Sequence, residues 1–297
     1  MKGIAIKKPY WTRGVSGMAC VESVIFLIVM TFLITSSEAV NVALSYAYEP
    51  NVTALSKFDW AVVDGDANFE PPKGGNSANR TVWLSYVSVG EVQSHRPFFK
   101  QMPRSWLIGK NDAWESYVIN QTAPGWTSFF VEKVATPFWN RGFKGFFLDT
   151  LDSYQIVAKT EAQRQAQENG LAQTILALKH QFPNAILIMN RGFEIMSRVH
   201  QAANMVAFES LYAGWNQAKQ KYMPVSENDR NWLLAQVQGI KTQYNLPILA
   251  IDYCPPKNMT CVRTTVNRII QQGIVPYVTD PQLQTVGYGP QNLNQTH

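Results

Sequence analysis

The chain has 297 residues, of which 46% are hydrophobic and 16% charged, and it carries a formal net charge of +5. This composition supplies a sizeable core and excludes global disorder. Lysine and arginine form no basic run interleaved with aromatic residues, so the charge does not indicate a nucleic-acid partner.

Residues 1–39 have the features of an export signal. Basic residues up to Arg13 come first, an apolar run follows, and small residues flank a candidate cleavage site at Ser37-Glu38-Ala39. The apolar run is too short for a stable membrane span. We therefore expect a secreted or periplasmic protein, with an uncleaved membrane tether as the alternative. Without this leader, 22 basic and 19 acidic residues leave a net charge of +3.

Short apolar runs then alternate with longer amphipathic stretches. The runs span residues 43–48, 60–63, 82–89, 117–119, 145–148, 186–189, 205–208, 248–251 and 274–278. Such nearly continuous apolarity is typical of strands buried on both faces. Helices are predicted over residues 162–180, 229–240 and 260–271, where apolar side chains recur three and four residues apart.

This alternation predicts an α/β fold, a single (β/α)8 TIM barrel over residues 40–289. An open doubly wound sheet is disfavoured because no Gly-rich dinucleotide turn follows the first strand. Nine runs are candidate strands but a (β/α)8 barrel has eight, so either 43–48 or 117–119 is expected to be an accessory strand. Residues 65–79 are predicted to form a surface loop, and residues 290–297 a polar tail.

Polar residues follow most of the predicted strands. In a barrel these strand ends meet at one mouth, where active sites lie. A single acid at such a position is often a helix cap or half of an ion pair, but a ring of acids favours an acidic binding pocket. The strand-end residues are Asp64, Glu91, Asp149, Asn190, Arg191, Glu209, Asp252 and Asp280.

The chemistry expected of this pocket is glycoside cleavage by two carboxyl groups. No G-x-S-x-G, H-E-x-x-H, P-loop or C-x-x-C motif follows the leader. No cofactor or metal is expected, although clustered carboxylates leave an all-oxygen Mg²⁺ or Ca²⁺ site as an alternative. Asp149 and Glu209 are the predicted catalytic pair because only one predicted strand lies between the strands that carry them. The sequence leaves open whether cleavage retains or inverts the configuration.

Other residues are candidates for support. Asn190 and Arg191 are expected to hydrogen bond to the carboxylates or to contact substrate. Cys254 and Cys261 are expected to form a disulfide if the protein is exported. Four aromatic residues near the strand ends suit sugar stacking, with core packing as the alternative: Tyr86, Tyr212, Trp215 and Tyr253.

Six segments together resemble the endo-α-1,4-polygalactosaminidase type of glycoside hydrolase, and within it the hydrolase domain that accompanies Pel exopolysaccharide biosynthesis. They are residues 86–99, 142–154, 186–196, 208–215, 246–253 and 273–289. The resemblance implies a (β/α)8 barrel that cuts α-1,4-linked, partly N-acetylated galactosamine polymers, with catalytic carboxylates matching Asp149 and Glu209. It also implies a cationic polysaccharide partner held by Glu91, Asp152, Glu194, Asp252 or Asp280. A barrel that only binds polysaccharide and a metal-dependent polysaccharide-modifying enzyme are the alternatives.

Overall fold

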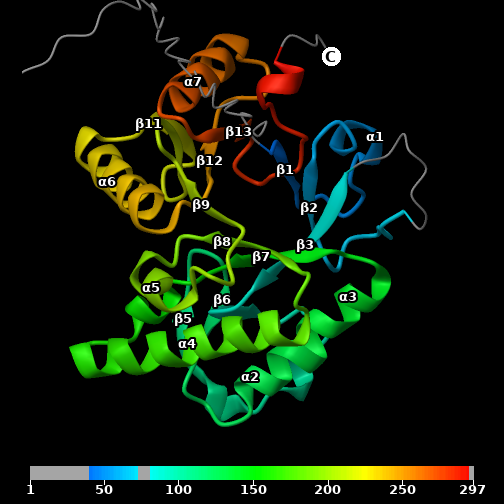
Figure 1. Cartoon of the computed structure of the whole chain (residues 1–297), viewed down its shortest axis with the longest axis vertical. Helices are drawn as coiled ribbons and strands as arrows, with labels where there is room; N and C mark the ends of the chain where they lie inside the picture. Colours follow the sequence, from blue (N-terminus) through cyan, green and yellow to red (C-terminus); the bar gives the residue numbers. More distant parts are fainter. Residues whose placement is uncertain (1–39, 73–80, 294–297) are drawn as a thin grey trace, which may run out of the picture. The chain divides into compact units, whose positions relative to one another are not determined.

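The computed structural model describes residues 40–72 and 81–293; the predicted leader and residues 73–80 of the predicted loop lie outside this range. Eight parallel strands form one sheet, as Figure 1 shows, and this confirms the predicted (β/α)8 barrel. In sheet order the strands are β1 (Val42–Ser45), β2 (Trp60–Asp64), β3 (Val82–Ser88), β7 (Gly145–Asp149), β8 (Ile186–Asn190), β9 (Met205–Glu209), β12 (Ile248–Tyr253) and β13 (Val275–Thr279).

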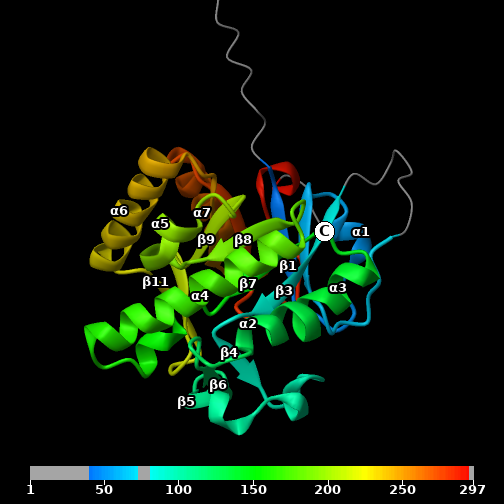
Figure 2. The same ribbon diagram turned by 60° about the horizontal axis from the view of Figure 1, so that its bottom comes forward.

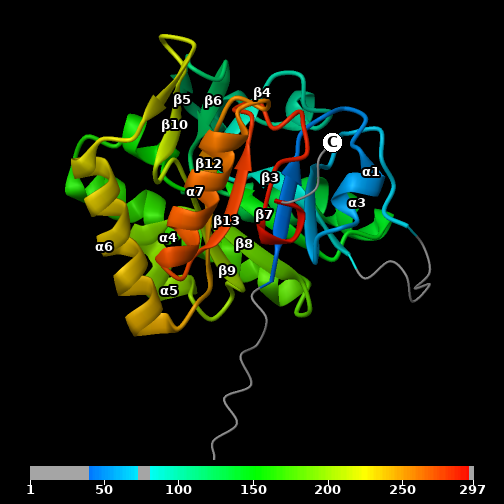
Figure 3. The ribbon, with the colours of Figure 1, turned by 90° about the horizontal axis from the view of Figure 1, so that it is seen from above.

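The first and last strands of this sheet, β1 and β13, lie next to each other (Figure 3). The Tyr46 amide donates to the Leu283 carbonyl at 2.8 Å, and the Tyr277 hydroxyl donates to the Leu44 carbonyl at 2.6 Å. These bonds join the two sides of the barrel, so the strand ends surround a common mouth.

The run at 117–119 is the accessory strand. It lies in β6 (Ser116–Ile119), which pairs antiparallel with β4 (Glu91–Gln93) and β5 (Leu107–Asn111). Figure 2 shows these three strands together outside the barrel. A second hairpin, β10 (Ala213–Asn216) and β11 (Lys221–Pro224), follows β9. The sequence does not predict β4, β5, β10 or β11, because these short, partly exposed strands have no continuous apolar run.

The three predicted helices are confirmed as α4 (Glu161–Gln181), α6 (Glu227–Tyr244) and α7 (Met259–Gln271). Capping fixes their starts: Thr160 and Gln163 form a capping box before α4, and the Ser226 hydroxyl accepts from the Asp229 amide at 3.1 Å before α6. The shorter helices are α1 (Val52–Leu55), α2 (Trp126–Phe129), α3 (Thr136–Arg141) and α5 (Met196–Val199).

Irregular turns complete the connections. A π-helical segment, Phe130–Ala135, joins α2 to α3, and Pro137 follows it within α3, where proline has no N–H to continue the regular hydrogen-bond ladder. The 3-10 turns are Phe99–Gln101, Arg104–Trp106, Ser153–Ile156, Phe193–Ile195 and Pro290–Asn292.

The barrel strands are apolar because both faces of the sheet are covered. Phe146, Phe147 and Phe208 are at most 1% exposed. At Gly145 an added Cβ would lie 2.0 Å from the Ile186 carbonyl oxygen, so glycine is required where β7 and β8 approach each other.

The described part of the predicted polar tail is attached to the barrel. Asn292 is 2% exposed, and its side chain donates to the Gly287 carbonyl at 2.9 Å and accepts from the Gly289 amide at 2.8 Å. Within residues 40–72 and 81–293, no helix is both long enough and apolar enough to cross a membrane.

Candidate active site

Three consecutive barrel strands end in the residues that form the centre of the site. Asp149 is the last residue of β7, Asn190 of β8 and Glu209 of β9. The residues that follow them, Thr150, Arg191 and Ser210, have φ values of 62°, 62° and 64°. The backbone therefore leaves the strand direction directly after each functional side chain, in a left-handed conformation that costs about 1–2 kcal/mol for a residue with a Cβ.

Thr150 is held in this conformation by its hydroxyl group. Its Oγ1 accepts from the Gly90 amide at 2.8 Å and lies 2.8 Å from the Ser88 hydroxyl. Gly90 is needed for this contact, because a Cβ there would lie 2.1 Å from the Thr150 carbonyl oxygen. The turn after β3 thus fixes the turn after β7 and, with it, Asp149.

The Asn190 amide bridges the two predicted catalytic carboxylates. Its Nδ2 donates to Asp149 Oδ1 at 2.8 Å and to Glu209 Oε1 at 3.0 Å. These two oxygens therefore cannot be more than about 6 Å apart, the limit set by two hydrogen bonds to one nitrogen. Asn190 Oδ1 is buried without a partner in the described part of the chain, so the two carboxylates alone fix the amide's orientation.

Each carboxylate also receives a tyrosine hydroxyl. Tyr86 donates to Asp149 Oδ2 at 2.8 Å, and Tyr253 donates to Glu209 Oε2. Burial, followed by the charge of the neighbouring carboxylate, raises the pKa of both tyrosines well above the usual value. Both hydroxyls stay protonated at neutral pH and act as donors. Tyr46 packs against Tyr86 with ring centroids 4.6 Å apart.

The pKa of Asp149 is raised to about 6, first by burial and then by the charge of Glu209. Hydrogen bonds from Asn190, the Thr150 backbone and Tyr86 oppose this rise. Asp149 is therefore mostly ionised at neutral pH but takes up a proton in mild acid.

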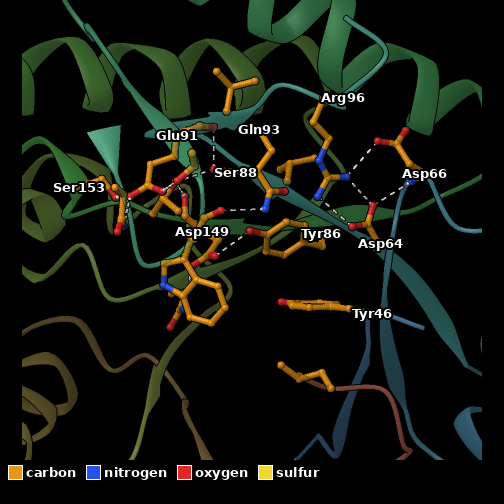
Figure 4. Close-up of a pocket in the computed structure, with 18 of the residues that line it drawn as sticks. Tyr46, Asp64, Asp66, Tyr86, Ser88, Glu91, Gln93, Arg96, Asp149 and Ser153 are labelled. Atoms are coloured by element: carbon orange, nitrogen blue, oxygen red, sulfur yellow. Dashed lines mark hydrogen bonds and ion pairs between the residues drawn. The ribbon is translucent and has the colours of Figure 1, made fainter. Parts of the chain in front are cut away.

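These groups line a cavity of about 470 Å³. Figure 4 shows Glu91 and Ser153 on one side of Asp149, and Asp64, Asp66 and Arg96 on the other. The cavity thus extends in both directions from the carboxylates. Among the described residues that line it are six acids and two bases, which are Asp64, Asp66, Glu91, Asp149, Asp152 and Glu209 with Arg96 and Arg191.

Arg96 organises one side of the cavity. It donates to both carboxylate oxygens of Asp64, at 2.7 and 2.9 Å, and to Asp66 at 2.9 Å. Its guanidinium carbon lies 5.9 Å from the centre of the Tyr86 ring. On the rim, Arg191 and Asp152 form a longer, partly exposed ion pair at 3.4 Å.

Glu91 organises the other side. It is 5% exposed, and its carboxylate accepts from Asn111 at 3.0 Å, from Ser153 at 2.5 Å and from Ser116. Because Ser153 follows β7 while Asn111 and Ser116 belong to the accessory sheet, Glu91 ties that sheet to the loop after Asp149. Within the described residues, no cation pairs with this buried carboxylate.

Five predicted site residues do not line the cavity, and three of them lie on the surface or in loop packing. Glu194 accepts from Gln155 on the surface at 3.1 Å. Tyr212 is 8% exposed and lies under the Arg268 guanidinium, 3.9 Å from its ring centre. Trp215 packs edge-on against Tyr222, and its Nε1 donates to Gln217 at 2.9 Å. The structure therefore places two of the four candidate stacking residues, Tyr212 and Trp215, outside the cavity.

Asp252 and Asp280 also lie outside it, as anchors of loop backbones. The Asp252 carboxylate is fully buried and accepts from the amides of residues 211, 212 and 213 at 2.7–2.8 Å. Burial raises the pKa of Asp252 to about 6, and these three bonds oppose the rise. Asp280 accepts from three amides and the hydroxyl within residues 282–285. Cys254 and Cys261 form the expected disulfide, which links the end of β12 to α7.

Sequence reasoning missed several residues of the cavity wall. Tyr46 comes directly after β1, but it lies inside the predicted run 43–48, so the sequence does not mark it as a strand-end residue. Arg96, Asp66 and Trp114 lie in connecting segments, where no periodic pattern marks them. In the described segments, no group of three or more His, Cys, Asp or Glu side chains is arranged to hold a metal ion.

Comparison with known proteins gives a family. The model of glycoside-hydrolase family GH114 matches residues 34–294, so the chain belongs to this family and is a glycoside hydrolase. The glycoside hydrolase domain of PelA from Pseudomonas aeruginosa is 33% identical, with a TM-score of 0.75 over 84% of this chain and 97% of that domain.

Two further relatives are more distant. Ega3 of Aspergillus fumigatus, solved in complex with galactosamine, is 15% identical, with a TM-score of 0.61 over 84% of this chain and 94% of Ega3; it supports the fold alone. An uncharacterized protein of Thermotoga maritima is 20% identical over 220 residues, which are 68% of this chain and 66% of that protein's length.

Proposed function

We propose that this family GH114 hydrolase cuts a galactosamine-containing, cationic polysaccharide at internal α-1,4 linkages, with retention of configuration. The observation that carries the proposal is the pair Asp149 and Glu209, held by one amide in the middle of an acidic cavity.

In this mechanism Asp149 is the nucleophile and Glu209 the acid and base. Asp149 attacks the anomeric carbon as a carboxylate, while Glu209 enters this step in its protonated form and protonates the glycosidic oxygen, whose bond to that carbon breaks. Glu209 then takes a proton from water, the water oxygen attacks the same carbon, and Asp149 leaves as a carboxylate. Tyr253 suits this exchange because its hydroxyl donates to ionised Glu209 and accepts from the protonated form.

The spacing of the carboxylates supports retention. Retaining glycosidases hold theirs roughly 5–5.5 Å apart, whereas inverting enzymes need roughly 6.5–9.5 Å to admit a water molecule. Hydrogen bonds of 2.8 and 3.0 Å to the same Asn190 nitrogen are compatible with the shorter separation.

The charge of the cavity supports a cationic substrate. Six carboxylates and two guanidinium groups among its described lining residues give an excess of acid, although the whole chain has a net charge of +5. Such local reversal of charge attracts and orients a substrate of opposite sign. The galactosamine bound to Ega3 is an amino sugar of this kind.

Two further features support internal cleavage outside the cytoplasm. Lining residues on both sides of Asp149 leave room for sugar units on both sides of the broken bond. The Cys254–Cys261 disulfide agrees with the oxidising compartment to which the predicted leader would direct the chain.

The test is to incubate the purified protein with defined α-1,4 oligomers of galactosamine, N-acetylgalactosamine and mixed composition. Mass spectrometry should show internal cleavage, and early NMR spectra should show the α-anomer. An initial β-anomer would refute retention, and tight binding without cleavage would favour a barrel that only binds polysaccharide. Loss of activity with a chelator would favour the metal-dependent alternative.

A further inference from the structure

One large aromatic side chain is exposed inside the cavity. Trp114 is 57% exposed and lines the cavity from the connection between β5 and β6. In the described part of the chain its indole ring makes no aromatic contact and its Nε1 has no hydrogen-bond partner. Among the described residues, the other exposed large aromatic side chains are Tyr48 and Trp232, and neither lines this cavity.

Two hydrogen bonds connect the backbone of Trp114 to the accessory sheet. The Trp114 amide donates to the Asn111 carbonyl at 3.2 Å, and its carbonyl accepts from Gln93 at 3.3 Å. Asn111 in turn donates to buried Glu91, which also binds Ser153 of the loop after Asp149.

A second contact fixes the same strand. At Gly109 of β5 an added Cβ would lie 2.3 Å from a methyl carbon of Val157, so the accessory sheet packs closely on the segment that follows Asp149. Polar and packing contacts therefore position the backbone of the segment that carries Trp114.

Trp114 belongs to the side of the cavity that Glu91 organises, since Asn111 and Gln93 come from the same small sheet. In Figure 4, the labelled Glu91 of this side lies across the cavity from Arg96, Asp64 and Asp66. A flat, exposed indole face presents apolar area to sugar C–H groups, and it also attracts an ammonium group such as that of an amino sugar.

We propose that Trp114 forms a distal subsite that stacks one sugar unit of the polysaccharide, beyond the units that contact Asp149 and Glu209. The proposal rests on the proposed function and adds a specificity for chain length. Long oligomers reach the indole ring, and oligomers too short to extend from the cleavage point to the accessory sheet do not.

The test compares Trp114→Ala and Trp114→Phe with the control Trp232→Ala, which removes an exposed indole from α6 outside the cavity. For a long galactosamine oligomer, Trp114→Ala should lower kcat/KM about five- to tenfold, mainly through KM, as expected for the loss of one exposed stacking contact. Trp114→Phe should recover most of this loss. For the shortest cleaved oligomer, all three variants should match the wild type.

Binding provides a second readout. In an Asp149→Asn background, calorimetry should show weaker binding of long oligomers with Trp114→Ala and unchanged binding with Trp232→Ala. Equal kcat/KM and affinity for Trp114→Ala and wild type on long oligomers would overturn the subsite, as would an equal loss on short ones. If the wild type neither binds nor cleaves any galactosamine oligomer, the proposed function itself fails, which is a different result.

Discussion

Replacing Asp149 with asparagine is expected to abolish turnover and to stabilise the fold at neutral pH. The pKa of Asp149 is about 6 in the folded protein, against an ordinary value of 3.8. At 1.36 kcal/mol per pKa unit, a difference of roughly two units corresponds to about 3 kcal/mol of unfavourable ionisation. The amide of the variant carries no charge and so removes this cost.

The sign of the effect depends on pH. Because the folded state holds the proton more tightly than the unfolded state, the stabilising contribution of Asp149 is complete below pH 3.8 and is lost as the pH rises through about 6. The gain from Asp149→Asn should therefore be near zero at pH 4 and reach at most about 3 kcal/mol at pH 8. Tyr86 accommodates the change, since its hydroxyl can accept from the new amide.

Thermal unfolding at the two pH values measures this difference. One kcal/mol shifts Tm by roughly 2–4 °C in a domain of this size, so the variant should gain several degrees at pH 8 and almost none at pH 4. Asp152→Asn is the control, because Asp152 forms only a partly exposed ion pair with Arg191 and should give no such gain. A Tm shift that is equal at both pH values, or negative at pH 8, would refute the electrostatic reasoning, and retained turnover would refute the catalytic assignment.

Three further predictions follow from the contacts around the site. In chemical denaturation at pH 7.5, Asp252→Asn should not show the gain expected of Asp149→Asn, although burial raises the pKa of both acids to about 6. Its amide nitrogen would face backbone N–H groups that can only donate, and this loss of about 1–3 kcal/mol offsets the removed cost of ionisation; an equal gain would refute the reasoning. Gly90→Ala should cost about 1–3 kcal/mol and most of the activity, since its Cβ would displace Thr150 next to Asp149; wild-type kcat would contradict this. KM for a galactosamine oligomer should rise as the salt concentration increases from roughly 0.05 to 0.5 M, because the Debye length falls below the size of the site over this range. A KM that does not change with salt would refute electrostatic attraction.

The sequence predicts the barrel well because buried parallel strands leave an unmistakable apolar run. It also predicts the positions of Asp149 and Glu209, since each is the last residue of its strand and faces the mouth. The connecting segments carry no such periodicity, so Trp114 and Arg96 can be located only once the accessory sheet and the loops are folded around the mouth.

Asp252 shows how one residue of register separates a site residue from a structural one. It follows a buried run just as Asp149 does, but it is the fifth of six residues in β12, and Tyr253 is the last. Neighbouring residues of a strand point to opposite faces. Tyr253 therefore reaches Glu209, while Asp252 points to the backbone of the loop after β9. The sequence shows where the apolar run ends but not where the strand ends. The position of the acid relative to the strand end decides whether it faces the cavity or the loop backbone.

The partners of the two buried acids separate their roles further. Asp252 is bound by three backbone N–H groups, which can only donate and therefore suit only the ionised form of its carboxylate. Asp149 and Glu209 are bound by tyrosine hydroxyls, which can donate or accept, and by one shared amide. Groups that tolerate both protonation states are what proton transfer requires. In the same place, a residue with a left-handed backbone conformation follows each of the three strands, and the Asn190 amide oxygen is buried without a partner in the described chain. Features that destabilise the fold are therefore concentrated where the proposed chemistry takes place.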